Sequence, residues 1–164
     1  MSNIGLIIVP LITIVLAIGV TNMYRNRKNA IAGYNRALEL HLSRVDDYAK
    51  ENGFKIDDTY FTVTDTKEGL LLAINNNKKL CVVSSSDEIY SFKINEIKEC
   101  DLYKEEDGEP QYYTSLGLKI VFSDGSEKKL ILGHTKRKIK SYIASMVQKN
   151  VDDLQLFIKS VAKI

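Results

Sequence analysis

Candidate catalytic residues in this chain are few and scattered. His41 and His134 are its only imidazoles, and no glycine-rich phosphate loop, GxSxG elbow or HExxH pair of histidines occurs. Asp57 and Asp58 are adjacent, as are the two acids at 46–47. Adjacent side chains point apart in a helix or loop, so we interpret both pairs as solvated surface charge. The sequence therefore predicts a protein that is not an enzyme and has no cofactor.

The two cysteines, Cys81 and Cys100, fall in predicted strands without CxxC spacing or partner histidines for a metal. We interpret them as reduced, half-buried thiols, as expected inside a cell. The alternative is a disulfide, which requires the two strands to pair and would place the domain in an oxidising compartment.

Charge is distributed unevenly, although the net charge is only +2. Residues 96–109 contain seven acids and two lysines, a balance of −5, whereas residues 127–140 contain six bases and one acid, a balance of +5. Four of the bases form a cluster: Lys136, Arg137, Lys138 and Lys140. We expect this cluster in the first turns of a C-terminal helix. Positive charge there opposes the helix dipole, so helix stability does not explain its position.

Two interpretations of the basic cluster stay open. Near an anionic inner leaflet each lysine or arginine contributes about 1 kcal/mol, so the cluster could bind anionic lipid head groups. Alternatively, it is an ordinary basic surface that pairs with the acidic segment of its own domain or of a neighbour. We expect no nucleic-acid ligand, because the cluster lacks interleaved aromatic residues and the net charge is small.

The elements that would position these groups begin with an apolar segment. Ile4–Met23 contains no Asp, Glu, Lys or Arg, and Arg25, Arg27 and Lys28 follow it. Twenty helical residues rise about 30 Å, which matches the hydrocarbon core of a bilayer. We therefore predict a transmembrane anchor with a basic flank at residues 1–28. A cleaved signal peptide is the weaker alternative, because no basic n-region precedes the apolar run.

The basic flank also predicts the topology. Lysine and arginine stay on the cytoplasmic side of a membrane, so Arg25, Arg27 and Lys28 place the N-terminus outside and the remaining chain in the cytoplasm. The expected location is the inner or plasma membrane. Apolar residues at three- and four-residue steps then predict a juxtamembrane helix at 29–52, which stops at Asn52-Gly53. It could form a stalk, pair with a second chain or pack on the domain, and we expect packing.

Residues 53–164 predict one α+β domain. Asp124-Gly125 predicts a tight antiparallel hairpin between the last two strands. Tyr112 and Tyr113 either begin a strand or belong to a recognition loop. One long C-terminal helix follows, with Thr135 as a candidate N-cap, and the polar residues 150–153 leave a kink or break open there. Its apolar stripe comprises Ile139, Tyr142, Ile143, Met146, Val147, Leu154, Phe157, Ile158 and Val161. The seven expected strands are 60–64, 69–74, 79–84, 89–92, 96–103, 116–123 and 128–132.

This element order resembles that of a pleckstrin-homology-like (PH-like) domain, an antiparallel β-barrel or sheet capped by a C-terminal helix. Four segments, Gly69–Asn75, Lys79–Val83, Tyr90–Cys100 and Gly117–Phe122, are also similar to a pattern found in small bacterial and phage proteins of unknown function. The resemblance covers roughly residues 53–162. It implies a binding platform for lipid, peptide or protein.

We therefore expect a non-enzymatic single-pass membrane protein whose cytoplasmic PH-like domain binds a protein partner or the membrane surface. Its mechanism would be tethering, because an anchor raises the effective concentration of the domain near other membrane components. One alternative is a phage or mobile-element exclusion or immunity factor acting on an envelope protein. Another is a membrane-bound enzyme with an unrecognised site.

Overall fold

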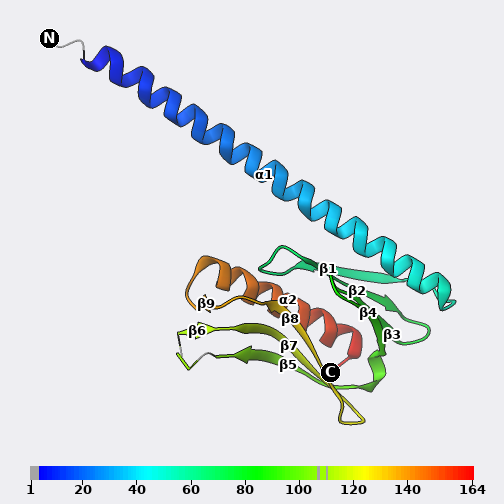
Figure 1. Cartoon of the computed structure of the whole chain (residues 1–164). Helices are drawn as coiled ribbons and strands as arrows, with labels where there is room; N and C mark the ends of the chain where they lie inside the picture. Colours follow the sequence, from blue (N-terminus) through cyan, green and yellow to red (C-terminus); the bar gives the residue numbers. More distant parts are fainter. Residues whose placement is uncertain (1–3, 107, 110) are drawn as a thin grey trace. The chain divides into compact units, whose positions relative to one another are not determined.

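The computed structural model describes residues 4–106, 108–109 and 111–164, with side chains described from Ile18 onward. The chain divides into two compact units, residues 1–36 and 37–164. Helix α1 (Ile4–Glu51) supplies the described residues of the first unit and the first element of the second. All strands and the C-terminal helix belong to the second unit (Figure 1).

The predicted anchor lies mostly where side chains are not described. Ile4–Met23 is helical, but the side chains of residues 4–17 fall outside the described part. Within the described part, no helix is both long and apolar enough to cross a bilayer. Arg25, Arg27 and Lys28 are exposed on α1. The transmembrane anchor and its topology therefore stay predictions.

The second part of α1 packs on the domain. Val45 is fully buried against Leu71 and Val82, with Leu42 packed beside them. Of the three arrangements left open by the sequence, packing is therefore the one observed for the part of α1 that begins at residue 37. The predicted stop is confirmed, because α1 ends at Glu51 and Gly53 adopts a φ of +63°. That left-handed conformation suits glycine.

Two antiparallel sheets form the centre of the domain. Strands β1–β4 follow one another in the first sheet, and β5, β7 and β8 follow one another in the second. The short 3₁₀ helix η1 (Ile94–Glu96) connects the sheets, and β6 pairs separately with β9. All seven expected strands are confirmed; β6 matches the alternative in which Tyr112 and Tyr113 begin a strand, whereas β9 was not expected. The bounds are β1 Asp58–Val63, β2 Gly69–Asn75, β3 Leu80–Ser84, β4 Ile89–Lys93, β5 Ile97–Glu105, β6 Tyr112–Tyr113, β7 Ser115–Phe122, β8 Glu127–Gly133 and β9 Arg137–Lys138.

Strand β2 shows why the first sheet needs α1. All seven of its residues are buried. Leu70 and Leu72 face the main core, whereas Leu71 and Ala73 belong to the cluster that α1 covers. Alternate residues of a strand point to opposite faces, so a continuous apolar run requires a cover on both faces. Burial of a leucine side chain contributes about 1.5–3 kcal/mol, which makes α1 part of the fold.

The C-terminal helix α2 (Tyr142–Ala162) begins later than predicted. Its N-cap is Ser141, whose Oγ accepts a hydrogen bond from the Ala144 N–H at 3.2 Å. Thr135 is not the cap, because its hydroxyl and N–H both donate to Asp65. No break occurs at residues 150–153, since α2 is continuous there, and Asn150 Nδ2 donates to the Val63 carbonyl at 3.2 Å. The helix packs against β1, β5, β7 and β8 (Figure 1).

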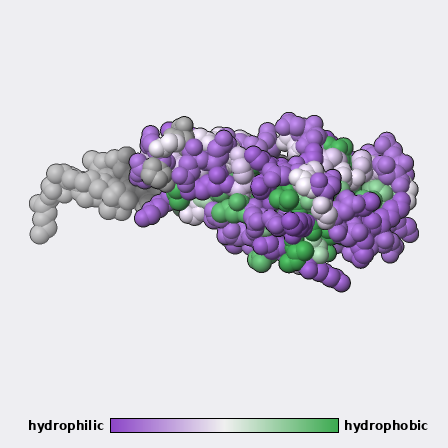
Figure 2. Space-filling view, turned by 90° about the horizontal axis from the view of Figure 1, so that it is seen from below, coloured by the Kyte–Doolittle hydropathy of each residue, from purple (hydrophilic) through white to green (hydrophobic). Residues whose placement is uncertain are grey.

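The predicted hairpin at Asp124-Gly125 is confirmed between β7 and β8. Gly125 has a φ of +83°, and Asp124 Oδ1 accepts a hydrogen bond from the Ser126 N–H at 2.8 Å. Turns of this kind favour Asp-Gly because both residues tolerate left-handed backbone angles. On the face of the protein drawn in Figure 2, hydrophobic residues appear as separate areas within a largely hydrophilic surface.

Candidate functional site

The residues considered first for catalysis have structural partners. His41 is buried on α1, and its Nδ1 lies 2.8 Å from Ser84 Oγ in a hydrogen bond. Burial, and then the positive charge of Arg44, lower the pKa of His41, so its neutral form is favoured. Asp57 and Asp58 are exposed and accept hydrogen bonds from nearby backbone N–H groups.

The cysteines do not pair. Cys81 lies on β3 and Cys100 on β5, in different sheets, and both thiols are free and buried. Burial raises the pKa of both thiols, that of Cys100 to about 11. They are therefore protonated and unreactive at neutral pH. Within the described part of the chain, no group of three or more His, Cys, Asp or Glu residues could hold a metal ion.

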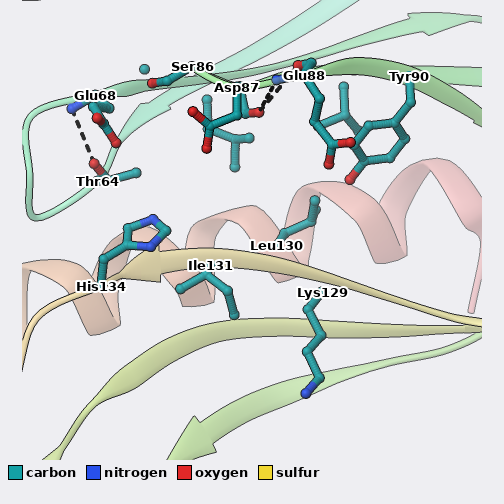
Figure 3. A pocket seen from close by; sticks show the side chains of 14 residues that line it. Thr64, Glu68, Ser86, Asp87, Glu88, Tyr90, Lys129, Leu130, Ile131 and His134 are labelled. Atoms are coloured by element: carbon teal, nitrogen blue, oxygen red, sulfur yellow. Dashed lines mark hydrogen bonds between the residues drawn. The ribbon is translucent and has the colours of Figure 1, made fainter.

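A small cavity of about 160 Å³ lies between the β3–β4 turn and β8 (Figure 3). Glu68, Asp87 and Glu88 line one side of it, whereas Lys129 and His134 come from β8 and the residue after it. Its buried lining is apolar except for Thr64, and its exposed acids are positioned to repel anions. Pockets that enclose small organic ligands usually measure about 300–1,000 Å³, so this cavity is small for such a ligand.

The predicted basic cluster is not on a helix. Arg137 and Lys138 form β9, which pairs with Tyr112 and Tyr113 of β6. The tyrosines therefore form a short strand, and Tyr113 is 2 % exposed. The expectation that the four bases crowd the first helical turns is wrong, because this β6–β9 pairing holds the chain extended before α2 begins.

Two of the four bases have partners inside the domain. Lys136 Nζ lies 3.8 Å from Glu109 Oε1 and 5.2 Å from the centre of the Tyr112 ring. Arg137 Nε lies 3.8 Å from Asp65 Oδ2. The Lys136 contact matches the interpretation in which the cluster pairs with the acidic segment of its own domain, whereas Arg137 pairs with an acid outside that segment.

Asp65, which sequence reasoning missed, anchors the connection between β8 and β9. Its carboxylate is fully buried and accepts hydrogen bonds from the His134 N–H at 2.9 Å and the Thr135 N–H at 3.2 Å, as well as from the Thr135 hydroxyl. Burial alone would raise the pKa of Asp65, but these hydrogen bonds outweigh it and the pKa lies below its ordinary value. Arg137 contacts this fixed carboxylate as an ion pair, without a hydrogen bond from its buried Nε.

The other two bases face solvent beside exposed apolar side chains. Lys138 and Lys140 are exposed, and no described carboxylate lies within ion-pair distance of either. Tyr142 is 85 % exposed, Met146 40 %, and Ile139 and Ile143 36 % each. We call Lys138, Ile139, Lys140, Tyr142, Ile143 and Met146 the α2 tip.

The α2 tip corrects the predicted apolar stripe. Val147 and Leu154 are fully buried as expected, but Tyr142, Ile143 and Met146 are exposed. Helical periodicity identified an apolar face without showing which side of the helix packs on the sheets. Ala144, in the same first turn, is 2 % exposed, so Tyr142 and Met146 are exposed because they lie on another side of the helix. Exposed apolar groups bordered by polar residues are typical of surfaces that contact a protein or a membrane.

Comparison with known proteins adds no assignment. No protein-family model, no curated protein and no solved structure matches the chain. The α2 tip is therefore interpreted from its own residues, their exposure and their charges.

Proposed function

We propose that this chain is a non-enzymatic, single-pass membrane protein whose cytoplasmic domain is a PH-like binding module that docks on the anionic inner surface of the membrane. The α2 tip carries this proposal. Tyr142 is 85 % exposed there, and Lys138 and Lys140 have no described acidic partner. Aromatic and aliphatic side chains beside lysines are the composition of segments that bind the interface of anionic membranes.

The energetic terms favour lipid over water at this surface. Each lysine near an anionic leaflet contributes about 1 kcal/mol, so Lys138 and Lys140 together contribute about 2 kcal/mol. Tyrosine is favoured at the level of the head groups, because its ring is apolar and its hydroxyl is polar. Ile143 and Met146 add apolar surface that leaves water when the tip enters the head-group region.

The predicted anchor supports the same proposal from the other end of the chain. Ile4–Met23 would hold the domain at the membrane, and Arg25, Arg27 and Lys28 would place it on the cytoplasmic side, where anionic lipids are enriched. A weak surface contact becomes effective under these conditions, because tethering makes the contact intramolecular. The proposed PH-like assignment is supported by the order of the elements, a four-stranded and a three-stranded antiparallel sheet followed by one packed helix.

Vesicle flotation of residues 29–164, which lack the anchor, tests the docking surface. We expect this fragment to float with vesicles of phosphatidylcholine and phosphatidylglycerol at low salt, and to float less at physiological salt. Vesicles of phosphatidylcholine alone should not carry it. The double variant Lys138→Glu and Lys140→Glu should bind at least about 30-fold more weakly, because it loses two contributions of about 1 kcal/mol.

A matched control separates the tip from net charge. The double variant Lys55→Glu and Lys98→Glu changes the net charge by the same amount at two exposed lysines outside the tip, and it should keep most of the binding. Tyr142→Ser with Ile143→Ser should weaken flotation at physiological salt as well, because salt does not screen apolar burial. Fragment that stays unbound under all conditions would contradict docking and favour the second candidate, a protein partner.

The anchor is tested separately on the full chain. We expect the full chain to remain in the membrane fraction after alkaline carbonate extraction, whereas residues 29–164 are released. Release of the full chain would contradict the integral membrane assignment, whatever the flotation result.

A further inference from the structure

A groove of about 440 Å³ lies beside the α2 tip, between β5 and the first turns of α2. Its apolar lining includes Leu102 on one wall, Tyr113 and Leu116 at its buried side, and Ile139 at the edge that it shares with the tip. Its volume falls within the range of about 300–1,000 Å³ that is usual for ligand sites.

The groove is an uncovered continuation of the core. Cys100 and Leu102 are two residues apart on β5 and therefore share one face of the sheet. Cys100 is 1 % exposed, and the Leu118 residue paired with Leu102 is fully buried, yet Leu102 itself is 48 % exposed. α2 covers Cys100, whose carbonyl accepts a hydrogen bond from Gln155 Nε2 at 2.7 Å.

The space above Leu102 is not filled, because the side chains of α2 that lie over it are short. Ala144 and Ser145 line the groove from the first turns of the helix, where a longer side chain would fill it. Ala144 is 2 % exposed, so the helix backbone closes the groove on that side. The result is an apolar slot that opens where the tip begins.

Charges at the rim favour an anionic head group. Lys149 lines the groove and is exposed, and Lys138 and Lys140 flank Ile139 at the shared edge. The rim acid Asp152 accepts a hydrogen bond from Gln148 Nε2 at 2.8 Å. The remaining rim base, Lys104, has its Nζ 2.6 Å from Glu106 Oε1, so this pair is internally neutral. Asp152 keeps its negative charge, because the Gln148 amide is neutral, but Lys138, Lys140 and Lys149 outnumber it, so the net charge of these groups is positive.

We infer that the groove between β5 and α2 accepts the acyl chain of one anionic membrane lipid, with the lipid phosphate held by Lys149 and the lysines of the α2 tip. An acyl chain matches an apolar slot whose polar groups gather at the rim, and a phosphate matches the positive rim. The inference rests on the proposed function, because docking of the tip brings the mouth of the groove to the bilayer. It extends that function from a surface contact to the binding of an individual lipid.

Photocrosslinking of the full chain in vesicles tests the inference. The vesicles contain phosphatidylcholine and phosphatidylglycerol, with a trace of phosphatidylglycerol that carries a diazirine at the end of one acyl chain. After illumination, mass spectrometry locates the modified residues. We expect adducts on Tyr113 or Leu116, which line the groove and are each 2 % exposed. Adducts within Ile4–Met23 report the anchor in the same sample.

A variant that fills the groove provides the control. Ser145→Trp places a large side chain at the exposed residue that lines the groove, and it should abolish the adducts on Tyr113 and Leu116 while adducts within the anchor persist. Ser160→Trp, an exposed position further along α2, should leave both sets unchanged. Circular dichroism of both variants checks the fold.

The outcomes separate the two proposals. Adducts within the anchor or on Tyr142, with none on Tyr113 or Leu116, would overturn the groove inference and leave docking intact. Adducts on Tyr113 and Leu116 that persist in Ser145→Trp would also overturn it, because they would not come from the groove. A chain that fails to enter the vesicles at all would instead contradict the membrane assignment of the proposed function.

Discussion

The contact between α1 and the first sheet and the α2 tip use similar residues in opposite ways. In the first region the polar side chains have partners across the contact: Ser84 binds His41, and the Ser85 carbonyl accepts from Arg44. Val45, which follows Arg44 on α1, is fully buried. In the tip, apolar side chains are exposed and two lysines lack described acidic partners.

The difference shows that residue type does not distinguish fold from function in this chain. Both regions place basic residues among apolar ones along helical sequence, although Lys138, Ile139 and Lys140 of the tip precede α2. Only the contacts separate them, because an apolar side chain that packs on the domain stabilises the folded state, whereas an exposed one is available to a ligand. The comparison predicts that substitutions in the two regions affect different measurements.

The largest effect on stability should come from the covered face of the first sheet. Leu71 is fully buried under α1, and Leu71→Ala should lower the free energy of unfolding by about 2–5 kcal/mol, because it leaves a cavity. Tyr142→Ser should change that free energy by less than about 0.5 kcal/mol, because the side chain is 85 % exposed. Urea denaturation of residues 29–164 measures both. Equal losses would mean that the tip belongs to the core.

A smaller effect on stability is expected at Asp65, which fixes the connection between β8 and β9 that precedes the α2 tip. Asp65→Asn replaces a buried acceptor of three hydrogen bonds and should cost about 1–3 kcal/mol. The folded-state pKa of Asp65 lies below its unfolded value, so its contribution is fully present above the unfolded pKa and is lost as pH falls through the folded pKa.

The measurement for Asp65 is urea denaturation of the wild type and Asp65→Asn at neutral pH and at successively lower pH. The two proteins should converge in stability as the pH falls below the ordinary range of an aspartate. Asp58→Asn is the matched control, because Asp58 is an exposed carboxylate that accepts a hydrogen bond from the Thr59 N–H. A difference that persists unchanged at low pH would show that the charge of Asp65 is not what stabilises the connection.

Much of the sheet structure was predictable because its signals are local. Turn residues such as Asp124-Gly125 fix a hairpin through backbone angles that depend on two residues. The run Gly69–Asn75 likewise indicated a strand, although only the packing shows that α1 covers its second face. Strand β9 and its pairing with β6 were missed because a two-residue strand has no periodicity to detect.

The candidate site was less predictable because it depends on partners distant in sequence. Asp65 meets Thr135 across a sequence separation of 70 residues, and this contact delays the start of α2. The sequence placed Arg137 and Lys138 in one functional cluster, but the fold pairs one with Asp65 and leaves the other exposed. The exposure of Tyr142 depends on which side of α2 packs on the sheets, which the periodicity of α2 alone does not encode.

The smallest effect concerns His41. At this residue we expect the stability of the contact between α1 and the first sheet to depend on pH. Its folded-state pKa lies below the unfolded value of 6.5, the reverse of a histidine that gains an acidic partner. The unfolded chain therefore binds more protons at acidic pH, and stability is full above pH 6.5 and declines as pH falls through the folded pKa. His41→Gln keeps a polar side chain near Ser84 and should remove this decline between neutral and mildly acidic pH. Urea denaturation across that range, with the exposed His134→Gln as control, measures it. A decline that is equally steep in His41→Gln would mean that other groups cause it and that the contact of α1 with the sheet is insensitive to protonation.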